Sequence, residues 1–250
     1  KEINSLRELP KTELMDSNFM PSKIKDDILY NIVGYMKASI NINGIDVNIY
    51  YGFFKKTDFN ELKKIRKVCD ENNLGLHLDG ARLWNALILK NETAKQYGKV
   101  FDTISVCLSK GLGCPIGSVL VGNSEIMQNA LRIRKIFGGN MRQVGYLAAA
   151  GLYALDNNIE RLTEDHKKGK EIGEALAKLS FIKTIEPIET NIVIFELNKD
   201  VSEEIFVQKL TDKNIHIIGM GGGKLRIVTH LDYTDVMHEK LLDILKYLKV

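Results

Sequence analysis

The fold of this chain is decided by two segments, Leu76-His77-Leu78-Asp79-Gly80-Ala81-Arg82-Leu83-Trp84-Asn85-Ala86 and, about thirty residues later, Ser105-Val106-Cys107-Leu108-Ser109-Lys110-Gly111-Leu112-Gly113. Each segment is an apolar run that ends in polar groups, with Asp79 at the end of the first and Lys110 after the second. Short buried strands that present functional groups at their carboxyl ends show this pattern in parallel α/β sheets. We therefore expect Asp79 and Lys110 on neighbouring loops above one edge of a sheet.

A lysine and a carboxylate in this arrangement are the basis of a site for pyridoxal 5'-phosphate (PLP). The lysine forms a Schiff base, and the carboxylate keeps the pyridine nitrogen protonated so that the ring accepts electrons. Lys110 is followed by Gly111 and Gly113, whose small size leaves room for a cofactor, and a half-buried amine there has a lowered pKa. The ordinary alternatives are a solvated lysine, an Asp-Gly turn at Asp79 and a packed core histidine at His77.

Four further cations are candidates for binding anions. Arg82 could contact the cofactor or Asp79, or be a surface arginine at a helix start. Arg226 lies in an apolar strand, where a planar guanidinium is suited to clamp an amino-acid carboxylate. Lys135 and Arg142 flank the glycine-rich turn 137–140 and could hold a phosphate or carboxylate, although such turns are more often plain connections between helices.

Composition limits the class of protein. A chain of 250 residues with 44% hydrophobic content can bury one large or two smaller cores. The net charge of +3 is small and the charged residues are mixed, so we expect no nucleic-acid partner. The three cysteines form no CxxC pair, which favours a reduced, cytoplasmic setting, and no metal site is expected. No apolar stretch is long enough to cross a bilayer, and residues 1–30 do not have the pattern of a signal peptide.

Periodicity predicts an α/β fold with a mostly parallel sheet flanked by helices, plus a small C-terminal α+β domain. Residues 1–24 are expected to form an arm, residues 25–158 a large PLP-binding domain, and residues 159–250 the small domain. Within the large domain, helical spacing predicts a helix over 25–39, and alternation predicts a strand or hairpin over 41–54. Asp58 is expected to cap a helix at 59–73. The remaining expected elements are strands 75–79, 102–108, 116–121, 181–186, 191–196, 215–218 and 224–229, and helices 82–90, 124–136, 142–157, 159–179, 203–213 and 235–248.

Four matching segments resemble the threonine aldolases of the β-eliminating lyase group, which are fold type I PLP enzymes built like aspartate aminotransferase. The segments are His77-Leu78-Asp79-Gly80-Ala81-Arg82-Leu83-Trp84-Asn85-Ala86; Ser109-Lys110-Gly111-Leu112-Gly113 with Pro115, Gly117 and Ser118; Met141-Arg142-Gln143-Val144-Gly145; and Leu225-Arg226-Ile227-Val228-Thr229-His230. Their order and spacing fit the family from about residue 57 to the end.

The resemblance implies a role for each candidate. Lys110 would form the Schiff base, Asp79 would bind the ring nitrogen, and Arg82 would lie beside the phenolic oxygen of the cofactor. Arg226 would hold the substrate carboxylate. Lys135 and Arg142 would reach an active site, either that of their own subunit or that of a neighbouring subunit. The implied reaction is cleavage of threonine or allo-threonine to glycine and acetaldehyde. The implied assembly is a homo-oligomer, a dimer or a tetramer.

Residues 1–54 depart from the family pattern. They contain no Asp-Leu-Arg-Ser-Asp motif and no Ser-Gly-Thr loop, and no histidine precedes His77. We therefore expect the large domain to be incomplete on its N-terminal side, because that region is either truncated or remodelled relative to the family. Two alternatives to an aldolase stay open at this point: another fold type I PLP lyase that eliminates at Cβ, and a catalytically dead subunit with a structural or interaction role.

Overall fold

The computed structural model describes residues 32–42, 45–54 and 58–249, and it divides into two units at the junction between Leu76 and His77. The predicted arm, residues 1–24, lies outside the described residues. The predicted boundary between domains near residue 159 falls inside the second unit and stays a prediction.

The first unit contains a β-hairpin and a helix. Strands β1 (Ile32–Ile42) and β2 (Ile45–Phe54) pair antiparallel. Strand β2 confirms the strand alternative predicted over 41–54, and most of its hairpin partner β1 lies before that range. The helix predicted over 25–39 is wrong for residues 32–39, because they belong to β1; residues 25–31 lie outside the described part. The prediction rested on Ile28, Leu29, Ile32, Val33 and Met36, which recur at helical spacing. Three of these five are β-branched and also suit a strand, and the adjacent strand β2 supplies the hydrogen-bond partners.

Helix α2 (Phe59–Glu71) begins where the sequence predicts. Asp58 is its N-cap, with an extended backbone and a side-chain oxygen that accepts from Asn60 N at 3.1 Å. The cap satisfies one of the amide groups that a helix start leaves without an intrahelical partner. The helix buries one apolar stripe, formed by Leu62, Ile65, Val68 and Cys69.

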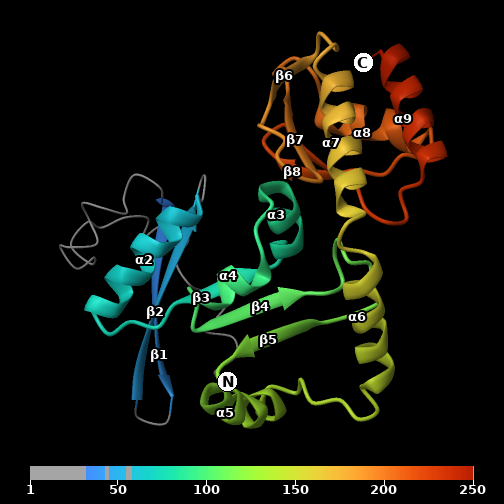
Figure 1. Cartoon of the computed structure of the whole chain (residues 1–250). Helices are drawn as coiled ribbons and strands as arrows, with labels where there is room; N and C mark the ends of the chain where they lie inside the picture. Colours follow the sequence, from blue (N-terminus) through green and yellow to red (C-terminus); the bar gives the residue numbers. More distant parts are fainter. Residues whose placement is uncertain (1–31, 43–44, 55–57, 250) are drawn as a thin grey trace. The chain divides into compact units, whose positions relative to one another are not determined.

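The second unit opens with a three-stranded sheet in the order β3-β4-β5, seen in green in Figure 1. Strand β3 (His77–Gly80) pairs parallel with β4 (Thr103–Cys107), and β4 pairs antiparallel with β5 (Ser118–Gly122). The described sheet is therefore mixed, with one parallel and one antiparallel pair. The parallel connection passes through helices α3 (Leu83–Lys90) and α4 (Ala94–Gly98), of which the short α4 was not predicted.

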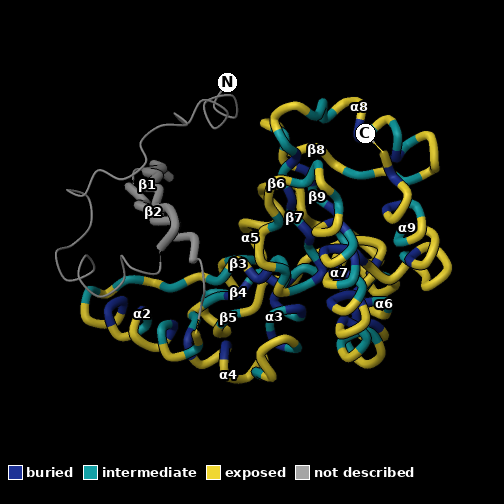
Figure 2. Tube along the Cα trace, turned by 90° about the horizontal axis from the view of Figure 1, so that it is seen from above, coloured by how far each residue is buried: buried dark blue, intermediate teal, exposed yellow. Residues whose placement is uncertain are grey.

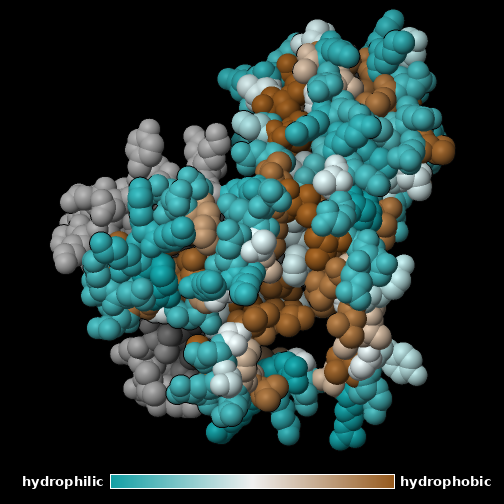
Figure 3. Space-filling model, in the orientation of Figure 1, coloured by the Kyte–Doolittle hydropathy of each residue, from teal (hydrophilic) through white to brown (hydrophobic). Residues whose placement is uncertain are grey.

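Two helices lead from the sheet towards the C-terminal half. Helix α5 (Ser124–Ile136) contains no buried residue, and α6 (Gly145–Asn157) buries Gly151 and Ala154. Figure 3 shows hydrophobic residues gathered over β5 and α6. Exposed large hydrophobic side chains there include Val119, Leu120, Val121, Tyr146, Leu152 and Tyr153.

The C-terminal half is an antiparallel sheet covered by helices. Strands β6 (Ile182–Ile185), β7 (Ile192–Leu197), β9 (Lys224–Val228) and β8 (Ile218–Gly221) form a four-stranded sheet in that order. The C-terminal half also contains three helices, α7 (Leu162–Leu176), α8 (Glu203–Thr211) and α9 (Asp235–Tyr247). These bounds agree with the predicted elements within a few residues, apart from β8, which was predicted over 215–218 and is found at Ile218–Gly221.

One face of this sheet forms the main core. Phe195 of β7 packs edge-on against Phe206 of α8, with ring centroids 5.9 Å apart, and both are almost completely buried. Buried and half-buried residues alternate along β7 and β9, as expected for strands with one face on a core. Figure 2 shows the buried positions of α7, β7 and β9 in dark blue. None of the described helices is long and apolar enough to cross a membrane.

Candidate active site

The parallel pair β3–β4 places Asp79 beside the strand that leads to Lys110. Asp79 is in register with Ser105, five residues before Lys110. The two backbones approach closely at Gly80, where an added Cβ would lie 2.6 Å from the carbonyl oxygen of Ser105. The strand ends therefore meet at one sheet edge, as the sequence predicts.

The environment of Asp79 differs from the expected buried strand end. Asp79 and His77 are both exposed, because β3 is an edge strand of the described sheet. The side chain of Asp79 accepts a hydrogen bond from Ala81 N at 3.1 Å, so it forms the local Asp-Gly turn considered above. His77 is not a core residue, and its Nδ1 lies 2.8 Å from Thr103 Oγ1.

Lys110 lies on a loop that is closed by backbone hydrogen bonds. Gly117 O accepts from Leu108 N at 3.0 Å, and Lys110 O accepts from Gly113 N at 2.9 Å. Gly113 has a φ of +73°, a conformation that favours glycine, and an added Cβ would lie 2.7 Å from Leu231 Cδ2. The side chain of Lys110 is exposed rather than half-buried, because no described element covers it, and it is open to a reacting carbonyl.

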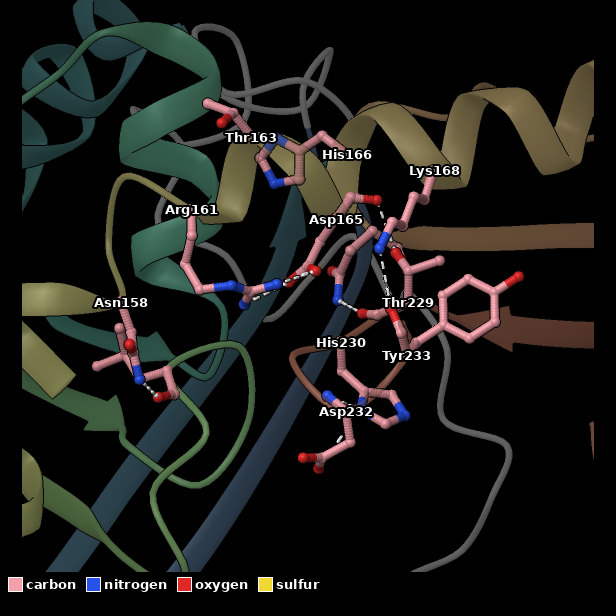
Figure 4. Close-up of polar contacts among 12 residues, drawn as sticks. Asn158, Arg161, Thr163, Asp165, His166, Lys168, Thr229, His230, Asp232 and Tyr233 are labelled. Atoms are coloured by element: carbon pink, nitrogen blue, oxygen red, sulfur yellow. Dashed lines mark hydrogen bonds and ion pairs between the residues drawn. The ribbon is translucent and has the colours of Figure 1, made fainter. Parts of the chain in front are cut away.

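Two asparagine side chains, one partly buried and one fully buried, support this loop. Asn158 Nδ2 donates to Leu112 O at 2.7 Å (Figure 4). Asn85 is 1% exposed and lies against the loop, since an added Cβ on Gly111 would be 3.0 Å from Asn85 Oδ1. Asn85 Nδ2 also contacts His166 Nε2 of α7 at 3.1 Å. Burial lowers the pKa of His166, which favours the neutral imidazole that can accept this hydrogen bond.

A second group of residues brings Arg82 and Arg226 together. Arg226 alternates with the buried Leu225 and Ile227, so it lies on the sheet face opposite the main core. Burial lowers the pKa of Arg82, and the charge of Arg226 lowers it further. Arg82 Nη1 donates to the side-chain oxygen of Asn191 at 3.1 Å. The charges of Arg82 and Arg226 therefore act on each other, and the hydrogen-bond partner of Arg82 is the neutral side-chain amide of Asn191.

No described residue balances this positive charge with a carboxylate. Within the described part of the chain, neither Arg82 nor Arg226 forms an ion pair, and Arg226 Nε is buried without a hydrogen-bond partner. A buried donor without a partner is costly, and an anionic ligand would satisfy it. The arrangement is therefore suited to bind a carboxylate or a phosphate.

Lys135 and Arg142 are not part of this group. Lys135 is in the last turn of α5, Arg142 is in the connection to α6, and both side chains are exposed. Although the backbone oxygen of Lys135 accepts from Gly138 N at 3.2 Å, neither side chain forms a hydrogen bond or ion pair with the residues that the structure describes. Their proposed role at an active site stays a prediction.

Four residues around the site were not predicted from the sequence: Asn85, Asn158, His166 and Asn191. Asn191 directly precedes the apolar strand β7, and a polar residue in that place is usually interpreted as part of a turn. Asn85 lies within the segment that resembles the family, yet an asparagine in a short helix gives no sign of its partner. A buried amide can be recognised from its contacts, which join residues far apart in the chain.

Comparison with known structures identifies the class of fold. A putative L-allo-threonine aldolase from Listeria monocytogenes matches with a TM-score of 0.64 and 22% identity, over 77% of this chain and 57% of that chain. The fold is that of the fold type I PLP-dependent enzymes, which confirms the predicted fold class.

The chain belongs to the beta-eliminating lyase family, whose pattern matches residues 56–200. It is 35% identical over 184 residues to a probable low-specificity L-threonine aldolase 2 from Arabidopsis thaliana, covering 72% of this chain and 52% of the relative. It is 38% identical over 183 residues to a low specificity L-threonine aldolase from Escherichia coli K12, covering 73% and 53%. The chain thus spans about half the length of the curated relatives it matches.

Proposed function

We propose that this chain carries the lysine, carboxylate and arginine groups of a PLP-dependent lyase. The reaction would cleave β-hydroxy-α-amino acids, converting threonine or allo-threonine to glycine and acetaldehyde. Membership of the beta-eliminating lyase family and similarity to low-specificity L-threonine aldolases support this activity. The observation that carries it is the pair Arg82 and Arg226, which has an unsatisfied buried donor and no carboxylate among the described residues.

The residues present fit the cofactor and an amino-acid substrate. Lys110 would hold PLP covalently through its exposed amine, and the Asp79 carboxylate would accept a hydrogen bond from the protonated ring nitrogen. When bound, PLP supplies the acceptor for the electron pair released as the Cα–Cβ bond breaks. Arg226 would hold the substrate carboxylate through its two-pronged guanidinium and so fix which bond at Cα faces the ring. Arg82 would add a second positive charge beside the anionic ligand.

The same observation favours an enzyme over a structural subunit. A structural role would require Arg226 to be neutralised by a carboxylate of the protein itself. The structure describes no such partner, whereas a substrate carboxylate would supply both the charge and the missing acceptor. Elimination at Cβ by another fold type I lyase uses the same Lys110, Asp79 and Arg226, and product analysis distinguishes the two reactions.

Self-association and a cytoplasmic location are further parts of this proposal. The exposed apolar side chains of α5, β5 and α6 gather on one part of the surface instead of being scattered singly (Figure 3). Gathered apolar surface of this kind marks interaction sites. We propose a homo-oligomer, in which Lys135 and Arg142 reach a neighbouring active site. The three free cysteines support a reducing compartment. Light scattering after size-exclusion chromatography measures the oligomer, and a monomeric mass would contradict this part.

The experiment that tests the function uses the visible absorption of added PLP. Wild type should show the band of lysine-bound cofactor and release glycine and acetaldehyde from threonine, and Lys110→Ala should lose both. Lys95→Ala, an exposed lysine on α4, is the matched control and should keep both. Borohydride reduction followed by peptide mapping should find the cofactor on Lys110. A label on another lysine would reject the assignment.

A further inference from the structure

Asn191 is the uncharged hydrogen-bond partner of Arg82, and both its side chain and its backbone are bonded to Thr229. It is 1% exposed and lies immediately before β7. Its side-chain Nδ2 donates to Thr229 O at 2.6 Å, and its backbone oxygen accepts from Thr229 N at 3.0 Å. Thr229 follows β9, the strand that carries Arg226. Asn191 therefore connects the end of the Arg226 strand to Arg82.

Thr229 is itself firmly placed, so the connection has a rigid base. Thr229 is 1% exposed, and its Oγ1 donates to Asp165 O at 2.7 Å (Figure 4). The side chain of Asp165 is fully buried and accepts two hydrogen bonds from Arg161, at 2.6 and 3.2 Å. Close packing adds to this order, since a Cβ on Gly169 of α7 would lie 3.6 Å from Asn191 Cα.

The partners of Asn191 determine which way its amide points. Thr229 O can only accept a hydrogen bond, so the NH₂ group must face it. Arg82 can only donate, so the amide oxygen must face the guanidinium. A flipped amide would set two donors together and two acceptors together. The contact with Arg82 is therefore fixed in direction by the backbone of Thr229.

The neutrality of Asn191 matters as much as its direction. An aspartate at this position would neutralise Arg82 and would place a carboxylate oxygen against the carbonyl of Thr229. The amide oxygen instead orients the guanidinium and leaves its charge uncompensated. Two such charges in a partly desolvated place repel each other, and that repulsion is relieved when an anion binds.

We propose that Asn191 is a positioning residue of the anion site: its side-chain oxygen directs the Arg82 guanidinium, and its lack of charge leaves Arg82 and Arg226 available to an anionic ligand. This inference deepens the proposed function and rests on it for the identity of the ligand. It adds that anion affinity is set in part by a residue that does not touch the anion.

The test measures binding of inorganic phosphate to the full chain by calorimetry. Asn191→Asp should weaken phosphate binding by about tenfold or more, because a charged hydrogen bond to Arg82 competes with the ligand. Asn191→Ala, which removes the oxygen without adding charge, should weaken it less.

The matched control is Asn198→Asp. Asn198 directly follows β7, and its Nδ2 donates to Ser180 O at 2.9 Å, so the variant adds the same charge and loses the same kind of hydrogen bond. Its phosphate affinity should equal that of wild type. In an Arg82→Gln background, Asn191→Asp should cause no further loss, since its effect acts through Arg82.

Three results would overturn the inference. One is phosphate affinity that is unchanged in both Asn191 variants while the unfolding temperature falls, which indicates a structural role alone. Another is an equal loss from Asn191→Asp with and without Arg82, and the third is a wild type that binds no phosphate. Absorption of added PLP is recorded on the same proteins. A wild type that binds phosphate at this site but no PLP rejects the proposed function and leaves the role of Asn191 standing.

Discussion

Replacing Gly80 by alanine should disturb both the central sheet and the placement of Asp79. A Cβ at this position would lie 2.6 Å from the backbone oxygen of Ser105, about 0.8 Å inside ordinary contact, which begins at 3.4 Å. A backbone atom within a strand cannot rotate away, so β3 and β4 must separate. Overpacking of this kind costs roughly 1–3 kcal/mol, and the rigid neighbour places Gly80→Ala near the upper end of that range.

The free energy of unfolding from urea titration measures this cost, and the spectrum of added PLP measures the displacement of Asp79. Gly98→Ala is the matched control, because Gly98 belongs to the same unit and an added Cβ meets nothing within 4 Å. That control should change stability by no more than about 1 kcal/mol, in the stabilising direction expected for Gly to Ala in a helix. If Gly80→Ala unfolds within about 0.5 kcal/mol of wild type, the close approach of β3 and β4 is not as described.

Three further predictions concern charged and titratable groups. Arg226→Lys should weaken glycine binding by ~10-fold in a titration followed by the cofactor spectrum, because a point charge replaces a bidentate fork; unchanged affinity would reject the clamp. Asp165→Asn should lower the free energy of unfolding by about 3 kcal/mol, the low end for a buried pair, since Arg161 keeps 17% exposure and can be partly rehydrated. Burial lowers the pKa of His166 from its ordinary 6.5, so the unfolded chain protonates first and stability should fall as pH drops below about 6.5. His166→Gln should flatten this dependence by up to about 1.4 kcal/mol per pH unit, and an equal slope in both proteins would contradict it.

Individual helices and turns could be predicted from the sequence because the interactions that determine them join residues only a few positions apart. Asp58 caps α2 through an amide two residues away, and α5 covers the predicted range 124–136. The glycine-rich sequence at 219–223 predicts a turn between two strands, and Gly222 and Gly223 do form it with positive φ, whereas Gly219 and Gly221 belong to β8. Such features depend on caps, turns and periodic burial, which neighbouring residues determine. The fold class and the positions of the strand ends follow from the same local patterns.

The error at residues 32–39 shows where local pattern is insufficient. Apolar residues at helical spacing fit a helix over a few turns, but the same residues also fit a strand once a partner strand is adjacent. The pairing of β1 with β2 decides between them, because it satisfies the backbone groups of both strands. The exposure of Asp79 and Lys110 is a similar case, since burial depends on which elements cover a strand end.

The sequence by itself determined the family, the lysine and carboxylate at the strand ends, and Arg226 as an unusual charge in an apolar strand. Only the tertiary structure showed that Arg82 meets Asn191, 109 residues away in the chain, and that Asn85 meets His166 across 81 residues. The physical reason is that hydrogen bonds within a helix or turn are fixed by adjacent residues. Contacts between distant segments arise from how helices and sheets pack, which no single segment encodes.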